Sequence, residues 1–141
     1  MAGLVILALV LRSTSGIPEI PPPGDVEAVA LGARLYAAHC ASCHGVALQG
    51  QQDWRQRKPN GRLPAPPHDR SGHTWHHSDE ALFRITRDGL GAFAPPGYLS
   101  DMPAFGALLN DGEIAAVVTF IKSTWPVEIR MRQTAISGTP R

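Results

Sequence analysis

The sequence contains little of what several common function classes require. It has only two cysteines in 141 residues, which excludes a zinc site built from two Cys pairs. Its 13 basic and 12 acidic residues leave a formal charge of +1, which excludes the strongly basic surface typical of a nucleic-acid-binding domain. The one long apolar run, at residues 2–11, is too short for a bilayer, which takes about 20 residues.

Aromatic residues are scarce as well. They make up 6% of the chain, whereas it has 13 prolines and 14 glycines. The hydrophobic share of 43% argues against disorder, and the length suits a single domain. A domain with so few large apolar side chains and so many loop-forming residues is poorly supplied for a core. We therefore expect another group to fill its centre.

The two cysteines stand together in Cys40-Ala41-Ser42-Cys43-His44, which is C-x-x-C-H, the attachment signature of a c-type haem. A thioredoxin-like redox pair would want a βαβ context, and a zinc site would need further ligands. A disulfide across three residues would close almost no loop and stabilise little. The motif therefore predicts one haem c, linked covalently through Cys40 and Cys43, with His44 as an iron ligand.

The N-terminus resembles a targeting segment. Residues 2–11 are apolar or small, and small residues follow at 13–16. This pattern predicts a signal peptide or N-terminal hydrophobic segment over residues 1–16. No Lys or Arg precedes the apolar run, and Arg12 follows it directly, which is unusual for a signal peptide. The segment could therefore also be retained as a membrane anchor. Haem c is attached outside the cytoplasm, so we expect a periplasmic protein, bound at the inner-membrane surface only if the segment is retained.

Composition divides the remaining chain into three parts. Residues 17–24 (IPEIPPPG) are typical of an extended Pro-rich linker. Residues 25–126 carry the helical patterns of one domain. Residues 127–141 follow Pro126 and are expected to add a helical turn at most and then fray.

Three main helices are expected in the domain. Asp25, Ser78 and Asn110 are good N-caps, and Glu113 completes a capping box with Asn110. No strand is predicted, and the stretch of residues 45–73 has neither helix nor strand. A structureless stretch that long needs something to organise it, and a large rigid cofactor would do so. The predicted helices cover residues 25–41, 78–88 and 110–125.

An iron held by His44 needs a second ligand from far along the chain. Met102 is the strongest candidate, because it precedes Pro103 in an irregular Gly/Pro-rich stretch that could lie over a flat cofactor. Met/His ligation is an established arrangement for c-type haem. The alternative is that Met102 fills space in the core. The other candidates are Met131, His39, His68, His73, His76 and His77.

With these motifs the chain resembles a small bacterial class I c-type cytochrome, a mono-haem protein with His and Met ligands. The resemblance covers about residues 25–126. It implies an all-α fold, with three main helices and Pro/Gly-rich loops around one covalently bound haem. It also implies that Gly32 and Tyr36 pack against the last helix, at Val117 and Phe120. Gly32, without a Cβ, would let two helices cross closely.

The resemblance assigns two more residues to the haem site. It implies that the carbonyl of Pro66 accepts a hydrogen bond from His44, which would orient the ligand ring. The family usually has Leu two residues later, where this chain has His68, a polar group near the haem edge or turned outward. Trp75 resembles the aromatic residue that contacts a haem propionate, although a simple core Trp is the alternative.

Two further patches leave alternatives open. Residues 68–77 contain His68, His73, His76 and His77, which could bind copper or could decorate a loop. Residues 54–62 (WRQRKPNGR) carry four basic side chains. They could form a docking surface for an acidic partner, or simply a solvated loop.

These patterns together predict an electron carrier whose haem iron cycles between Fe(II) and Fe(III). Its expected partners are redox proteins, a reductase and an oxidase, with no nucleic acid. Two alternatives remain: the haem c electron-entry subunit of a larger oxidoreductase, or a haem protein with an additional copper site at residues 68–77. An enzyme that reacts with peroxide or a small gas would need an open iron, and Met102 argues against one.

Overall fold

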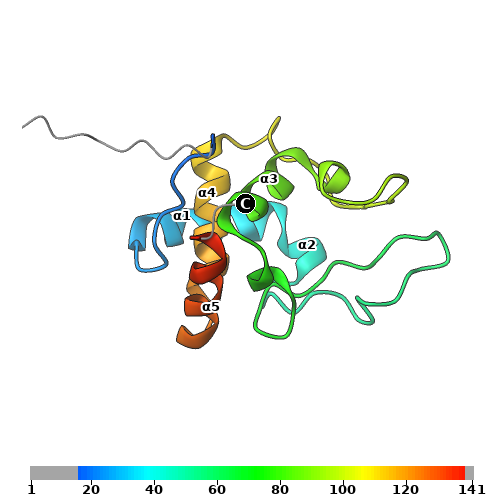
Figure 1. Ribbon diagram of the computed structural model, residues 1–141, viewed down its shortest axis with the longest axis horizontal. Coiled ribbons are helices and arrows are strands. Elements are labelled where there is room, and N and C mark those ends of the chain that lie inside the picture. The colour runs from blue at the N-terminus through cyan, green and yellow to red at the C-terminus, as the bar shows by residue number, and fades with distance from the viewer. Residues whose placement is uncertain (1–15, 139–141) are drawn as a thin grey trace, which may run out of the picture.

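The computed structural model describes residues 16–138, and within that range the chain is helical with no strand (Figure 1). The all-α prediction is therefore confirmed. Residues 1–15 of the predicted signal segment lie outside the described residues. The elements, in chain order, are α1 (Val26–His39), α2 (Ala41–His44), the 3₁₀ turn η1 (Thr74–His76), α3 (Asp79–Asp88), the 3₁₀ turn η2 (Leu90–Ala92), α4 (Asp111–Ser123) and α5 (Val127–Ser137).

The predicted caps begin the helices as expected. The Asp25 carboxylate accepts from the backbone N–H of Ala28 at the start of α1. The Ser78 hydroxyl caps α3 in the same way. Asn110 and Glu113 form a reciprocal capping box at the start of α4. Each cap satisfies helix N–H groups that have no partner inside the helix, so short-range sequence signals set these boundaries.

Helices α1 and α4 cross at Gly32, as the resemblance implied. A Cβ added to Gly32 would lie 2.0 Å from the Ala116 carbonyl oxygen and 2.8 Å from Cβ of Phe120. Tyr36, one turn on, packs its ring 5.3 Å from that of Phe120 and shares a buried cluster with Val117. The close contact at Gly32 itself is therefore with the Ala116 backbone, a partner that the sequence did not indicate.

The buried apolar residues form two clusters. Tyr36 and Trp125 belong to the first, which Cys40 and Trp75 border. Phe83 and Phe105 belong to the second, which Met102 borders. Leu35 of α1 borders both clusters, so this helix connects the two parts of the core.

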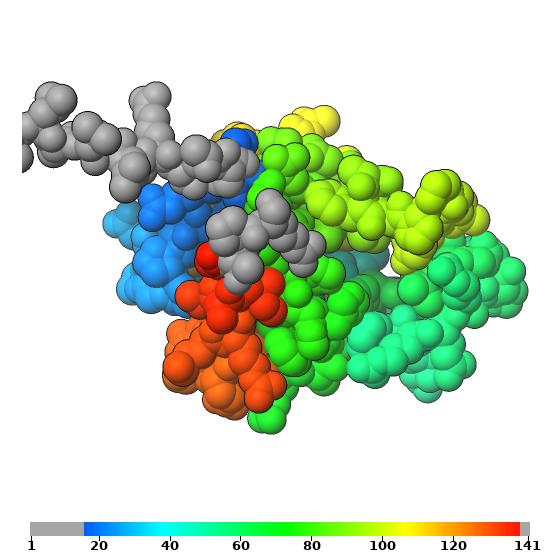
Figure 2. All heavy atoms as spheres, in the orientation of Figure 1, coloured from blue at the N-terminus to red at the C-terminus, as the bar shows by residue number. Residues whose placement is uncertain are grey.

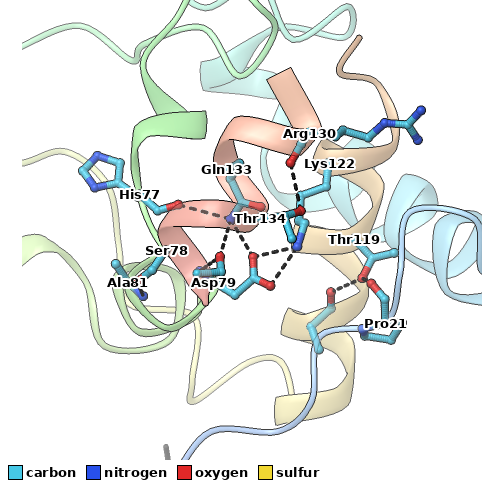
Figure 3. Close-up of polar contacts among 12 residues, drawn as sticks. Pro21, His77, Ser78, Asp79, Ala81, Thr119, Lys122, Arg130, Gln133 and Thr134 are labelled. Atoms are coloured by element: carbon cyan, nitrogen blue, oxygen red, sulfur yellow. Dashed lines mark hydrogen bonds and ion pairs between the residues drawn. The ribbon is translucent and has the colours of Figure 1, made fainter. Parts of the chain in front are cut away.

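The prediction for the C-terminal tail was wrong. Residues after Pro126 form α5, an eleven-residue helix. Gln133 of α5 is fully buried, and its amide donates to Asp79 at 2.7 Å, while Lys122 of α4 donates to the same carboxylate at 2.7 Å (Figure 3). Because a polar network holds this helix, together with Ile129, its sequence shows little of the apolar periodicity that predicts helices.

The linker over residues 17–24 is also docked on the domain. Ile17 and Ile20 pack against the second cluster, and the Thr119 hydroxyl of α4 donates to the Pro21 carbonyl at 3.0 Å (Figure 3). The Pro-rich segment is therefore packed against the helices and is more than a connection between the N-terminal segment and the domain. Within residues 16–138, no helix is long and apolar enough to cross a membrane.

Candidate functional site

His44 lies in α2, a single helical turn directly after α1, and its side chain is 7% exposed. Its Nδ1–H donates to the Pro66 carbonyl at 2.8 Å, the partner that the resemblance implied. Burial lowers the pKa of His44 below its ordinary value, against the smaller opposing effect of the Pro66 hydrogen bond. The ring is therefore neutral at pH 7. Its Nε2 carries no proton and has a free lone pair, which is the form of imidazole that binds a metal.

The two cysteines flank the same turn. Backbone N–H groups of both Cys43 and His44 donate to the Cys40 carbonyl, at 3.1 and 2.9 Å. Cys40 is partly buried against the first cluster, whereas Cys43 is exposed, and the two thiols are free. Burial, with the nearby Cys43, raises the pKa of Cys40 to about 11. The turn therefore presents two unpaired thiols beside the imidazole, the donor set that a covalently attached haem c requires.

The segment that carries Pro66 is held in place by the protein itself. Gln51 N–H donates to Ala65 O at 2.9 Å. A Cβ at Gly50 would lie 2.4 Å from the Pro67 nitrogen, and one at Gly72 would lie 2.0 Å from the Pro67 oxygen. Both glycines allow backbone to pass where no side chain fits. Sequence reasoning missed them, because nothing in the pattern separates them from the other loop glycines.

His68 is turned inward, against His44. The two rings stack with centroids 3.9 Å apart and planes 23° apart. Nδ1 of His68 lies 2.8 Å from the Thr74 hydroxyl, and burial and the neighbouring His44 hold the pKa of His68 well below its ordinary value. Ligands on opposite sides of an iron point nitrogen to nitrogen and do not stack face to face. This geometry disfavours His68 as the second ligand to the iron that His44 would bind.

Trp75 has a buried donor without a partner. Its indole Nε1 makes no hydrogen bond in the described part of the protein, although the ring borders the first cluster and packs on His76 at 3.7 Å. Leaving such a donor unpaired costs about 1–3 kcal/mol. An anionic acceptor from outside the chain, such as a haem propionate, would satisfy it. The unpaired Nε1–H of Trp75 is therefore the feature of this structure that a bound haem would explain, and the residues around it are compatible with haem.

Met102 is partly buried at the edge of the second cluster, near Phe83 and Phe105. Its backbone N–H donates to the Ser100 hydroxyl at 3.0 Å, and Phe105 N–H donates to the Thr86 carbonyl at 3.0 Å. The segment is irregular, as expected. Cys40 and Met102 thus border different clusters of the same small core.

The four histidines of residues 68–77 do not converge on one point, although the His73 and His77 rings meet edge to face with centroids 5.4 Å apart. His68 lies against His44, His73 stacks on Trp54 with centroids 5.4 Å apart, and His76 packs on Trp75. Across residues 16–138, no three His, Cys, Asp or Glu side chains are grouped to hold a metal ion. The geometry therefore gives no support to the copper alternative.

The basic side chains of residues 54–62 make contacts within the protein. Arg55 lies 4.0 Å from the Trp54 ring centroid. Arg62 donates to the Asp101 carboxylate, which lowers the pKa of Asp101 below its ordinary value, and Lys58 lies 3.7 Å from the same group. Two of the four basic side chains thus share one carboxylate, while Arg55 and Arg57 pack on aromatic rings and pair with no carboxylate in the described residues. The loop is tied to the Asp101 segment, and its role as a docking surface stays a prediction. Asp101 was missed, because its partners lie about forty residues away in the chain.

The comparisons agree with this site. A family model described as Cytochrome c matches residues 29–125, which include most of α1, the Cys40–His44 turn, the Met102 segment and α4. No curated protein and no solved structure matched the chain.

Proposed function

Because the chain belongs to the cytochrome c family and binds haem c, we propose that it is a periplasmic, mono-haem electron carrier with His44 and Met102 as the two iron ligands. Membership of the family establishes haem-based electron transfer. The observation that best supports the specific role is the His44 ring, held by the Pro66 carbonyl 2.8 Å away beside the free thiols of Cys40 and Cys43.

The haem supplies an iron that exchanges one electron between Fe(II) and Fe(III). His44 presents Nε2, because its other nitrogen is engaged by Pro66. That hydrogen bond fixes the ring orientation and raises the basicity of the ligand. Met102 offers a neutral, soft thioether that stabilises Fe(II) more than an imidazole does, and so favours a high reduction potential.

The remaining site residues anchor and orient. Cys40 and Cys43 would form the two thioether links, one partly buried and one at the surface. Trp75 would donate its unpaired indole N–H to a haem propionate and so hold the propionate edge of the haem against the protein. The surface near this turn carries the exposed Cys43 and, three residues later, Val46, which is 84% exposed. Reductase and oxidase partners would approach this surface.

Two properties of wild-type holoprotein test the attachment and the compartment. Thioether links survive denaturation, so haem should migrate with the polypeptide on a denaturing gel. Expression of the full chain with cell fractionation should place the haem-stained band in the periplasm, with cleavage near Gly16 if residues 1–16 are a signal peptide. Haem that runs free of the chain would contradict covalent attachment through Cys40 and Cys43.

The ligand assignment is tested with Met102 variants. Wild-type ferric protein should show the weak red sulfur-to-iron charge-transfer band. Met102→His should lose that band, stay low-spin and titrate at a lower potential, because imidazole favours Fe(III) more than a thioether does. Met102→Ala should open the iron to azide. Met131→Ala is the matched control, since Met131 is 69% exposed on α5. A wild-type protein without the band, unchanged by Met102→Ala, would identify Met102 as a core residue.

A further inference from the structure

Two segments far apart in the sequence meet beside the Met102 site. The basic loop, residues 54–62, and the Met102 loop, residues 98–102, project from the same side of the helices (Figure 1). In Figure 2 their surfaces lie close together, with the surface hollowed between them. The contacts join Arg62 and Lys58 of the basic loop to the carboxylate of Asp101, the residue directly before Met102.

The contact is more than one ion pair. Arg62 Nη1 donates to the Asp101 carboxylate and also to the Ser100 carbonyl at 3.3 Å. The guanidinium of Arg57 lies 5.3 Å from the Tyr98 ring centroid, within cation–π range. Three near neighbours of Met102, namely Tyr98, Ser100 and Asp101, are therefore held from the basic loop by charge, by hydrogen bonds and by a cation–π contact.

The tip of the basic loop is closed on itself, which fixes the direction of its side chains. Lys58 N–H donates to the Arg62 carbonyl at 2.8 Å, and Gly61 N–H donates to the Lys58 carbonyl at 2.9 Å. Arg57 Nη1 donates to the Gly61 carbonyl at 2.7 Å. This turn places Lys58 and Arg62 on one side, facing Asp101, so little backbone freedom remains to be lost when the pairs form.

We propose that Arg62 and Lys58 are positioning residues that hold the Met102 loop closed over the haem through Asp101. The proposal rests on the proposed function, in which Met102 binds the iron. Phe105 N–H, bonded to the Thr86 carbonyl at 3.0 Å, anchors the chain after Met102. The Asp101 contact anchors it before Met102, so the ligand is fixed from both sides.

The size of the effect follows from exposure. The side chains of Lys58, Arg62 and Asp101 are 39%, 36% and 48% exposed. Exposed pairs contribute modestly, and loss of the Arg62 contacts should raise the population of the open loop by about twofold to fivefold. Exposed charges are also screened by salt, so wild-type opening should increase with ionic strength.

The experiment measures how fast imidazole displaces Met102 from the ferric iron of the holoprotein. The red charge-transfer band is followed by stopped flow, and the limiting rate at saturating imidazole reports opening of the Met102 loop. Arg62→Gln and Asp101→Asn should each raise this rate about twofold to fivefold and flatten its salt dependence. Arg62→Lys keeps the charge and should restore part of the wild-type rate.

Arg55→Gln is the matched control. It removes the same charge from the same loop, but Arg55 packs on Trp54 and does not contact Asp101. Its exchange rate should equal that of the wild type. The double variant Arg62→Gln/Asp101→Asn should raise the rate by less than the product of the two single effects, because both substitutions remove the Arg62–Asp101 pair. Denaturant midpoints of all variants separate local opening of the loop from a loss of global stability.

The outcomes distinguish the two proposals. Equal exchange rates for Arg62→Gln and Arg55→Gln, or additive effects in the double variant, would overturn the positioning role while Met102 stays the ligand. A wild-type ferric spectrum without the red band would overturn the ligand assignment, and the positioning role with it.

Discussion

The contact at Gly32 gives the sharpest stability prediction. A Cβ there would lie 2.0 Å from the Ala116 oxygen and 2.6 Å from the Ala116 carbonyl carbon, both backbone atoms of α4 that cannot rotate away. To bring the first distance to about 3.0 Å, the smallest separation that real Cβ atoms tolerate, α1 and α4 must move apart by roughly 1 Å at their crossing. Close-packed interiors resist such a shift.

The expected cost can be set against the gain in helix propensity. Replacing Gly by Ala in a helix interior favours the helix by about 1 kcal/mol. Overpacking of a well-packed contact typically costs about 1–3 kcal/mol, and this site lies at the upper end because backbone must move. We expect Gly32→Ala to lower the free energy of unfolding by about 1–2 kcal/mol net, and Gly32→Val by more.

Urea denaturation of the holoprotein measures the effect. With a slope of about 2 kcal/mol per molar urea, a loss of 2 kcal/mol shifts the midpoint by about 1 M. Gly112→Ala is the control: Gly112 is exposed in the first turn of α4, and a Cβ there would meet only the Asn110 side-chain oxygen, at 3.3 Å. That variant should be neutral or slightly stabilised. A Gly32→Ala protein as stable as wild type would refute the close crossing.

Two further predictions concern the network around α5. Asp79→Ala strands the buried Lys122 ammonium, so the free energy of unfolding should fall by about 3 kcal/mol, whereas Lys122→Met should cost clearly less; equal losses in denaturant melts would contradict this asymmetry. Ending the chain after Pro126 removes Ile129 and Gln133 from the core, and should cost at least about 2 kcal/mol relative to a chain that ends after Ser137. If the chain that ends after Pro126 were as stable as the longer one, α5 would contribute nothing to the stability of the fold.

The positions fixed by short-range chemistry were predictable from the sequence. Asp25, Ser78 and Asn110 cap helices because their side chains reach N–H groups three residues away, whatever the rest of the chain does. The same holds for Cys40, Cys43 and His44, whose spacing on one turn determines how they lie relative to one another. Resemblance to a family added the longer-range contacts of Gly32 and Pro66.

Only the tertiary structure decided the contacts between distant residues with no local pattern. Helix α5 is held by Gln133 and Asp79, 54 residues apart, through polar groups that carry no periodic signal. The inward stacking of His68 on His44 depends on how the loop folds back. Arg62 and Asp101, 39 residues apart, meet because two irregular loops project from one side of the helices. Such pairs depend on where the backbone places them, which no local window of sequence records.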